Sequence, residues 1–338
     1  MGIFEFLYYL GYSTKKYYSF RNQKKLPYKV ISIGNITVGG TGKTPATIAL
    51  AEEAKRRGFS PVILTRGYKG TAKGPCFVSN QQSAISNQQF GDEPVLMAER
   101  LKDVPVVKCV DRYKGGMFAI QNFNSQLSSL NSQLLFLLDD GFQHWRLCRD
   151  KDVLLIDAES PFDNRRLLPV GPLREPLKEI ERADIIVLTK TYNIRQEIIN
   201  SLIGELKQYN PEAPVFLSGH RPSGFIKPSG ETMPVESAKD KNLYAFCGIG
   251  NPESFKKTIL STGGLLKGLK VYRDHYRYKP HDIEDILNEA QKNNANWIVT
   301  TEKDIMRLKG LNMPENLFAL TIEFTIGEKF YDEVFKGI

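Results

Sequence analysis

Cysteine is scarce in this sequence, and the cysteines that occur form no set. Four are scattered among 338 residues, with no C-x-x-C pair and no His/Cys spacing typical of a zinc site. This usage argues against a disulfide framework and a zinc centre, and it indicates the reduced thiols of a cytosolic protein. We also find no internal repeat.

A long uninterrupted apolar run is missing too. The most apolar segment, residues 1–12 (MGIFEFLYYLGY), is too short to span a bilayer, which takes roughly 20 apolar residues. It also lacks the preceding positive charge and the small-residue cleavage site of a signal peptide. The aromatic and basic residues that follow favour a segment lying in a membrane interface, and a helix packed on the protein's own core is the alternative. These residues are Lys15, Lys16, Tyr17, Tyr18, Phe20, Arg21, Lys24 and Lys25.

The overall composition is that of an ordinary soluble globular protein. Apolar residues make up 41% and charged residues 25% of the chain. A length of 338 residues suffices for two domains, or for one large domain with an appendage. The formal net charge of +8 favours an anionic partner such as a nucleotide, a phospholipid headgroup or a nucleic acid, without choosing among them.

Short aliphatic and β-branched runs alternate with helical stretches from about residue 30 to residue 217. Most of the runs are continuously apolar, as expected of parallel strands buried on both faces, so the pattern predicts an α/β fold with a mostly parallel sheet flanked by helices. Residues 79–89 and 121–133, rich in Ser, Asn and Gln, are predicted as surface loops or ragged helix ends. The predicted strands are Val30–Ile33, Val62–Thr65, Val104–Val107, Leu134–Leu138, Val153–Ile156, Ile185–Leu188 and Val215–Leu217.

A stretch dense in Pro, Gly and Ser, residues 218–241, has the composition of a linker. We therefore predict a larger domain over residues 1–217, which includes a membrane-contacting segment at about 1–25. A smaller α/β domain is predicted over residues 242–338. The strands predicted in the smaller domain are Leu243–Cys247, Leu269–Tyr272, Trp297–Thr300 and Leu317–Ile322.

The stretch ISIGNITVGGTGKTP, residues 31–45, places a glycine-dense loop between a predicted strand and a predicted helix. A phosphate-binding loop requires this context, because glycines let the backbone wrap with its N–H groups inward and the helix N-terminus adds a positive dipole end. Lys43 would reach the β- and γ-phosphates, and the Thr44 hydroxyl would ligate Mg²⁺. The usual pattern has a glycine where this chain has Thr37. The predicted nucleotide-binding residues of the loop are Gly39, Gly40, Thr41, Gly42, Lys43 and Thr44.

An acidic pair follows another predicted strand. The five apolar residues 134–138 run straight into Asp139 and Asp140 at the C-terminal edge of a strand expected to be buried. Two adjacent carboxylates in that place are costly without a cation, so they indicate a metal site near the phosphate loop. A solvated acidic turn is the alternative.

Two comparisons narrow the class of phosphate-binding protein. Partition-type ATPases carry a lysine immediately before the Gly-Gly pair, and here that residue is Val38. GTPases carry Asn/Thr-Lys-x-Asp after a late strand, and the nearest candidate, residues 189–192 (TKTY), lacks the aspartate. The sequence therefore favours an ATP-dependent transferase or ligase acting on a small or amphiphilic substrate.

A kinase of this kind needs a base to accept the proton of the acceptor hydroxyl. Asp92, in a Gly-Asp-Glu-Pro turn before a predicted helix, is one candidate, and a simple helix cap is the alternative. His275, in the smaller predicted domain, is the second candidate, and a surface histidine is the alternative. Paired across a cleft, the two residues would couple catalysis to domain closure.

Nine segments lie in order along nearly the whole chain: 34–45 (GNITVGGTGKTP), 65–68 (TRGY), 91–94 (GDEP), 111–112 (DR), 138–144 (LDDGFQH), 171–176 (GPLREP), 248–252 (GIGNP), 274–275 (DH) and 300–304 (TTEKD). Together these segments resemble the tetraacyldisaccharide 4′-kinase family. The resemblance implies a P-loop NTPase-like fold and ATP-dependent phosphorylation of the 4′-hydroxyl of a tetraacylated glucosamine disaccharide 1-phosphate, with Mg²⁺, to give lipid IVA in lipid A biosynthesis. It also implies peripheral attachment to the cytoplasmic face of the bacterial inner membrane and no nucleic-acid partner, and it leaves the oligomeric state open.

The resemblance further implies roles for individual residues. Arg112 and His144 are implied to contact phosphate or substrate, and Tyr68 is implied to neighbour the nucleotide. The apolar start of the chain matches the family's N-terminal anchoring segment. The implied magnesium ligands are Thr44, Asp139, Asp140 and Glu175. The implied catalytic residues are Lys43, Asp92, Asp139 and His275, with Asp92 as the base.

Two other functions stay open on the sequence. A soluble P-loop kinase or ligase for a small metabolite would act without lipid and without residues 1–12. A nucleotide-gated membrane-binding ATPase would have no acceptor chemistry, and its function would not need Asp92.

Overall fold

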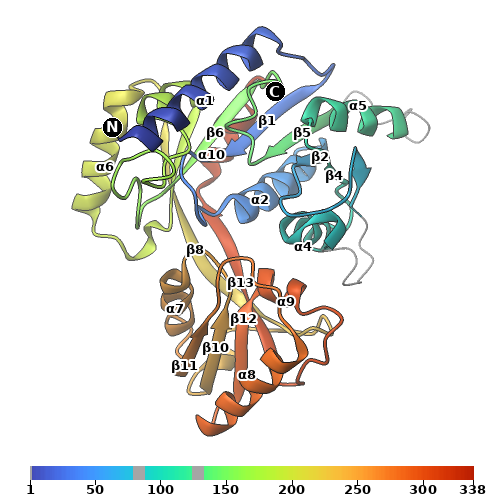
Figure 1. Ribbon diagram of the computed structural model, residues 1–338, viewed down its shortest axis with the longest axis vertical. Coiled ribbons are helices and arrows are strands. Elements are labelled where there is room, and N and C mark those ends of the chain that lie inside the picture. Colours follow the sequence, from blue (N-terminus) through green and yellow to red (C-terminus); the bar gives the residue numbers. More distant parts are fainter. Residues whose placement is uncertain (1, 79–87, 124–132) are drawn as a thin grey trace.

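The structure is a computed structural model that describes residues 2–78, 88–123 and 133–338. The chain forms two lobes joined by two long strands (Figure 1). We call residues 2–214 with the C-terminal helix the larger lobe, and residues 227–316 the smaller lobe. Both chain ends lie on the larger lobe.

The larger lobe is built around β1, which pairs in parallel with β5 on one side and β6 on the other. All six residues of β5 are buried, which is the physical reason for its continuously apolar sequence. The strands are β1 (Lys29–Gly34), β2 (Ser60–Thr65), β3 (Cys76–Phe77), β4 (Val106–Lys108), β5 (Leu134–Asp139), β6 (Lys151–Asp157) and β7 (Ile185–Thr189). The helices are α1 (Ile3–Arg21), α2 (Lys43–Arg56), α4 (Asp92–Arg100), α5 (Arg112–Phe123), α6 (Gln196–Tyr209) and α10 (Glu328–Phe335), with 3₁₀ turns η2 (Leu177–Arg182) and η3 (Thr191–Asn193).

The smaller lobe is a second α/β layer on strands β10, β11 and β12, which pair in parallel. Its core buries Phe246 against Tyr278 and stacks Trp297 on Phe318. The strands of this lobe and of the connection are β8 (Val215–Ile226), β9 (Thr232–Met233), β10 (Asn242–Cys247), β11 (Leu265–Val271), β12 (Trp297–Thr301) and β13 (Leu317–Ile326). The helices are α7 (Pro252–Leu260), α8 (Pro280–Lys292) and α9 (Glu302–Arg307), with a 3₁₀ turn η4 (Val235–Ala238).

One sheet runs through both lobes in the order β11-β10-β12-β13-β8-β7-β6-β1-β5-β2-β4-β3, with β9 paired to β8. Strand β8 pairs in parallel with β7 through Val215, Phe216 and Leu217, and its remaining residues pair antiparallel with β13. Most other pairings are parallel. The predicted α/β class, a mostly parallel sheet flanked by helices, is confirmed.

Residues 218–241, predicted as a linker, carry regular structure instead. Residues 218–226 continue β8 along β13, and β9 and η4 follow. Proline and glycine are tolerated there because the β8–β13 register shifts between Thr321 and Ile322, which lie opposite Gly224 and Pro222. The Pro, Gly and Ser residues that resembled a linker therefore belong largely to a bulged strand and the turns that follow it.

The C-terminal segment, residues 327–338, was predicted to belong to the smaller domain, but it packs on the larger lobe. Because β13 runs antiparallel to β8, it carries the chain back to the larger lobe, where α10 is buried in the same core as α2. Phe330, for example, has no exposed surface and contacts Phe216 and Phe324 with ring centroids 5.6 and 6.4 Å apart. The predicted loops at 79–89 and 121–133 lie mostly outside the described residues.

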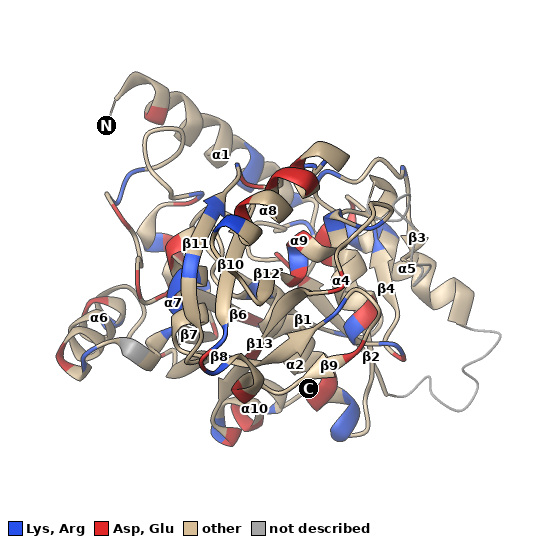
Figure 2. Ribbon diagram, turned by 90° about the horizontal axis from the view of Figure 1, so that it is seen from below, with Lys and Arg blue, Asp and Glu red and all other residues tan. Residues whose placement is uncertain are grey.

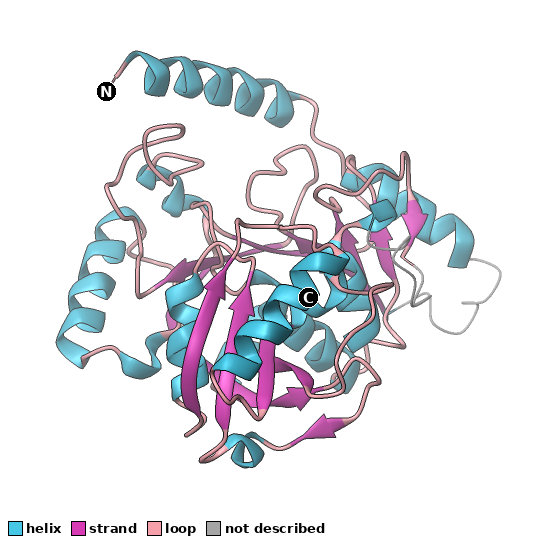
Figure 3. Cartoon of the chain, turned by 60° about the horizontal axis from the view of Figure 1, so that its bottom comes forward, coloured by secondary structure: helices cyan, strands magenta, loops and turns pink. Residues whose placement is uncertain are grey.

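Helix α1 lies across the outer side of the larger lobe (Figure 3). Only Glu5 and Tyr12 are buried among its residues, and the Tyr12 ring meets Trp145 edge-on at 5.4 Å. Within the described ranges, no helix combines the length and the apolar character needed to cross a membrane.

Replacing Phe330 should destabilise the larger lobe. Phe330→Ala would leave a cavity between α10 and the two connecting strands, and we expect a loss of about 3–5 kcal/mol in the free energy of unfolding, measured by urea denaturation. The matched control is Phe4→Ala, at a side chain that is 67% exposed, which should change stability by about 0.5 kcal/mol or less. Equal stability of the two variants would contradict the packing of α10.

Candidate active site

A cleft of about 1530 Å³ lies between the two lobes. It opens at the C-terminal ends of the parallel strands β1, β2 and β5, the edge at which α/β sheets usually bind ligands. The larger lobe contributes the loop after β1 and the residues that follow β2 and β5. The smaller lobe contributes the loop after β11 and the first turns of α7 and α9.

The phosphate-loop sequence forms the turn between β1 and α2. Gly39 and Gly42 have φ angles of +114° and +84°, which other residues rarely adopt, and Gly42 caps helix α2. A Cβ atom on Gly42 would lie 2.3 Å from Nε2 of His220, a residue of the connecting strand β8. The Lys43 ammonium lies 3.6 Å from Asp140 and 3.3 Å from the side-chain oxygen of Asn35. The loop is therefore closed from behind by β8, with its lysine beside the acidic pair.

The acidic pair carries two different pKa shifts. Asp139 is almost fully buried and accepts a hydrogen bond from the Thr65 hydroxyl at 2.9 Å. Burial, together with the charges of Glu93 and Asp140, raises the pKa of Asp139 to about 6. Burial would also raise the pKa of Asp140, but Lys43 and Arg174 outweigh it and hold that pKa well below its usual range. Carboxylates are thus concentrated at the end of β5.

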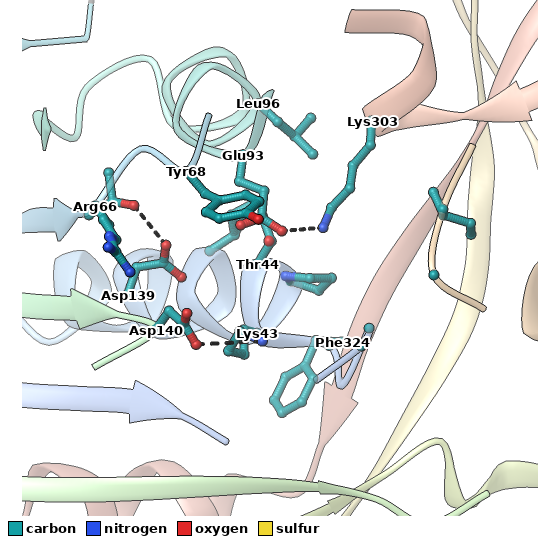
Figure 4. A pocket seen from close by; sticks show the side chains of 18 of the residues that line it. Lys43, Thr44, Arg66, Tyr68, Glu93, Leu96, Asp139, Asp140, Lys303 and Phe324 are labelled. Carbon is teal, nitrogen blue, oxygen red and sulfur yellow. Dashed lines mark hydrogen bonds and ion pairs between the residues drawn. The ribbon is translucent and has the colours of Figure 1, made fainter. Parts of the chain in front are cut away.

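A third carboxylate in this group comes from α4. Glu93 forms an ion pair with Lys303, which reaches across from α9, and Figure 4 shows Glu93 beside Thr44 and above Asp139. The charge of Lys303 lowers the pKa of Glu93 even though burial opposes it. The pair therefore links the acidic side of the cleft to the smaller lobe.

Glu175 does not join this acidic group. It is fully buried and forms an ion pair with Arg182 at 2.5 Å, and it also accepts a hydrogen bond from Gln143. Among the residues that the structure describes, no cluster of three or more His, Cys, Asp or Glu side chains is close enough to hold a metal ion. The implied set of Asp139, Asp140 and Glu175 is therefore not brought together among these residues, and Glu175 pairs with Arg182 instead. Burial raises the pKa of Glu175 to about 7, although Arg182 opposes that shift.

The two candidate base residues meet across the cleft. Asp92 opens helix α4 without capping it, and its Oδ2 lies 3.2 Å from Nδ1 of His275 in the loop after β11. Burial would raise the pKa of Asp92, but the hydrogen bond with His275 and the charge of Arg307 lower it below the usual range. The Tyr68 ring lies 5.6 Å from the His275 ring and is 59% exposed. Asp92 is thus ionised and held by the opposite lobe.

A group of cations lies in the same cleft, beyond the acidic pair. Lys15 of α1, Arg66 after β2 and Arg112 of α5 all line it, and burial together with repulsion from the two arginines lowers the pKa of Lys15. The Nε of Arg112 and the Nε2 of His144 are buried without a hydrogen-bond partner in the described part of the chain. Burial and the charge of Arg112 lower the pKa of His144 to about 3, so its imidazole is neutral. The unpaired guanidinium N–H of Arg112 suits an anion.

Sequence reasoning missed three residues that line the cleft. Lys303 lies inside segment 300–304, so the motif itself could have pointed to it. Arg307 lies just beyond that segment and carries no pattern of its own. His220 lies inside the stretch that resembled a linker, and the composition of that stretch concealed it.

Comparisons with known proteins bear on the family of the chain. A family model described as tetraacyldisaccharide-1-P 4′-kinase matches residues 1–337. The tetraacyldisaccharide 4′-kinase of Syntrophus aciditrophicus is 38% identical over 299 residues, covering 84% of this chain and 76% of the relative. That of Aquifex aeolicus is 36% identical over 323 residues, covering 93% and 91%.

A solved structure is similar over the same extent. The crystal structure of LpxK from Aquifex aeolicus in complex with ATP has a TM-score of 0.74 and 33% sequence identity, and the match covers 98% of this chain and 96% of that one. The family predicted from the nine sequence segments is confirmed. The chain belongs to the tetraacyldisaccharide 4′-kinase family.

Proposed function

We propose that the protein transfers the γ-phosphate of ATP to the 4′-hydroxyl of a tetraacyldisaccharide 1-phosphate. One observation carries the proposal: a single cleft holds Lys43 beside Asp140 on one side and Asp92 beside His275 on the other. A phosphate-binding lysine and a base facing one space are the two parts that phosphoryl transfer to a hydroxyl requires. ATP as the donor is supported by the Aquifex aeolicus relative, whose structure contains it.

Mg²⁺ is the ion that we infer for the acidic side of the cleft. Burial, together with the charges of Glu93 and Asp140, raises the pKa of Asp139, and a divalent cation held there would stabilise its ionised form. Thr44, Asp139 and Asp140 fit this role, because oxygen ligands at the end of a strand beside a phosphate loop are what the ion prefers. When bound, the ion would neutralise charge on the phosphate oxygens.

The chain's own residues would position the reactants. Lys43, at the start of α2, would hold the β- and γ-phosphates with the inward N–H groups of its loop. Asp92 would accept the hydroxyl proton, and its low pKa is compatible with that role because little proton transfer is needed before a loose transition state. His275 would stabilise the carboxylate from the smaller lobe.

The cationic group fits the phosphate that the acceptor already carries. Lys15, Arg66 and Arg112 line the cleft together, and the charges of both arginines act on Lys15 of α1. Asp92 of α4 instead meets His275 of the smaller lobe. A disaccharide with one phosphate and one free hydroxyl at opposite ends would place these two groups at separate subsites. The positive charge there therefore supports a phosphorylated acceptor over a neutral metabolite.

Helix α1 supports a lipid substrate and peripheral membrane attachment. Its basic residues lie in its C-terminal half (Figure 2), where Lys15 reaches the cleft, and large apolar side chains are exposed along the helix. Such a helix suits an anionic membrane surface, which we propose to be the cytoplasmic face of the bacterial inner membrane. The exposed side chains are Ile3, Phe4, Phe6, Leu7, Tyr9, Leu10, Tyr17, Tyr18 and Phe20.

Removing the proposed base should slow turnover strongly without weakening ATP binding. In Asp92→Asn we expect kcat to fall by about 10²-fold or more, with the KM for ATP changed by about threefold or less, because the carboxylate acts on the hydroxyl. The assay follows radiolabelled phosphate from ATP to the disaccharide 1-phosphate in detergent with Mg²⁺. The control is Asp103→Asn, at an 81% exposed side chain. Normal turnover of Asp92→Asn would favour the nucleotide-gated ATPase.

Removing one cation from the group should weaken binding of the acceptor alone. Arg66→Gln should raise the KM for the disaccharide 1-phosphate by about tenfold or more and leave the KM for ATP nearly unchanged. The reason is the loss of a charge-assisted hydrogen bond to the phosphate of the acceptor. Arg165→Gln, at a 58% exposed arginine paired with Glu205, is the control. An equal rise in both KM values would argue against an acceptor phosphate at this place.

Polar substitution of the apolar face of α1 should weaken membrane binding. We expect Phe4→Ser with Leu7→Ser to reduce co-sedimentation with anionic phospholipid vesicles by about tenfold or more, because both side chains would lose their burial in the acyl boundary. Leu260→Ser with Val271→Ser, at side chains of the smaller lobe that are 51% and 53% exposed, is the control. Unchanged binding of the α1 variant would contradict the proposed membrane contact.

A further inference from the structure

Two of the sequence segments, 248–252 and 300–304, have no part in the proposed reaction, yet both converge on Arg307. Its guanidinium, in α9, is only 5% exposed. Nη1 donates to the carbonyl oxygen of Gly248 at 2.6 Å and to Oδ1 of Asp304 at 2.8 Å. Nε donates to Oδ2 of Asp92, in the other lobe, at 2.6 Å. A single buried cation therefore joins both segments to the proposed base.

The guanidinium is held in place by a fixed carboxylate. Asp304 is fully buried and accepts hydrogen bonds from the backbone N–H of Gly248 at 3.1 Å, from the Tyr278 hydroxyl at 3.0 Å and from the Thr301 hydroxyl at 2.7 Å. Because Asp304 is saturated in this way, it orients Arg307 rigidly. The network belongs to the smaller lobe, and Asp92 is the part of it that the larger lobe supplies.

Nδ1 of His275 lies near both Asp92 and Arg307, and this explains why Asp92 needs Arg307 as a second partner. Nδ1 of His275 lies 3.2 Å from Oδ2 of Asp92 and 3.3 Å from Nη2 of Arg307. A guanidinium can only donate, so it suits an unprotonated Nδ1, whereas the carboxylate suits a protonated one. One nitrogen cannot satisfy both at once. Asp92 keeps the Arg307 contact whichever nitrogen of His275 carries the proton.

The contacts with His275 and Arg307 also make the two carboxylate oxygens of Asp92 unequal. Both His275 and Arg307 bind Oδ2, and no residue in the described part of the chain reaches Oδ1. One oxygen is therefore anchored while the other is left for a ligand. A fixed carboxylate with one open oxygen is the arrangement that a general base requires.

We propose that Arg307 is a positioning residue that anchors Asp92 to the smaller lobe and leaves Oδ1 for the acceptor hydroxyl. The inference rests on the proposed function, because it takes Asp92 as the base. It assigns the contact between the lobes a chemical role, since Asp92 is held for catalysis only while Arg307 lies against it.

The charged groups that face Asp92 are few. The smaller lobe contributes His275 and Arg307, and the helix of Asp92 itself contributes Glu93, whose charge is matched by Lys303. Arg307 lowers the pKa of Asp92, so losing it should raise that pKa. The base is active only when ionised, and the acidic limb of the pH–rate profile should therefore move to higher pH.

The test compares Arg307→Lys with a double variant, Arg307→Met with Asp304→Asn. The lysine keeps a charge beside Asp304 but lacks the planar fork. The double variant removes both charges of the buried pair, so neither is left unpaired and the fold is spared that loss. The control is Arg100→Gln, which breaks the 2.7 Å pair between Arg100 and Glu302, another contact between α4 and α9.

We expect kcat for lipid phosphorylation to fall by about 10-fold to 100-fold in both Arg307 variants, with the KM for ATP changed by about threefold or less. In the double variant, which removes the charge of Arg307, the acidic limb of kcat should move up by about one pH unit, a shift that a merely structural role would not produce. Arg307 variants that match Arg100→Gln in kcat and in pH profile, while Asp92→Asn is impaired, would overturn this inference alone. Normal turnover of Asp92→Asn would overturn the proposed base as well.

Discussion

The antiparallel ladder between β8 and β13 is the constraint on which the rest of the structure depends. The two strands hydrogen-bond from Ser218 opposite Ile326 to Ile226 opposite Ala319, and they connect the lobes. Each lobe carries half of the cleft, so the ladder determines which side chains face each other across it. His220 shows the connection directly, because this residue of β8 lies against Gly42 in the phosphate loop.

Oppositely charged side chains then align α4 with α9. Three ion pairs join these helices in the described part of the chain: Asp92–Arg307, Glu93–Lys303 and Arg100–Glu302. A further pair joins Glu99 of α4 to Lys309, just beyond the end of α9. Exposed pairs such as Arg100–Glu302 contribute little to stability, on the order of 0–1 kcal/mol. The buried pair of Arg307 with Asp92 instead fixes geometry, because leaving either charge alone in the cleft would be costly. The ion pairs between α4 and α9 thus orient the two lobes more than they stabilise the fold.

Much of this architecture was predictable from local pattern. Apolar runs such as residues 134–138 and the glycine-dense loop at 39–44 identify buried strands and a phosphate site by themselves, because each feature depends on neighbouring residues. Features that depend on tertiary pairing were not predictable. The bulged strand at 218–226 has the composition of a linker. Nothing in the sequence indicated that Glu175, implied as a metal ligand, pairs with Arg182.

The position of helix α1 has a consequence for the route that the acceptor takes. Tyr8 and Lys15 line the cleft from the same helix that exposes Phe4 and Leu7 outward. Were that apolar face to lie in the bilayer, as we propose, the side of the cleft formed by α1 would face the lipid headgroups. A glycolipid could then place its sugars in the cleft while its fatty acyl tails stayed among other lipids, which would avoid exposing methylenes to water at about 0.8 kcal/mol each.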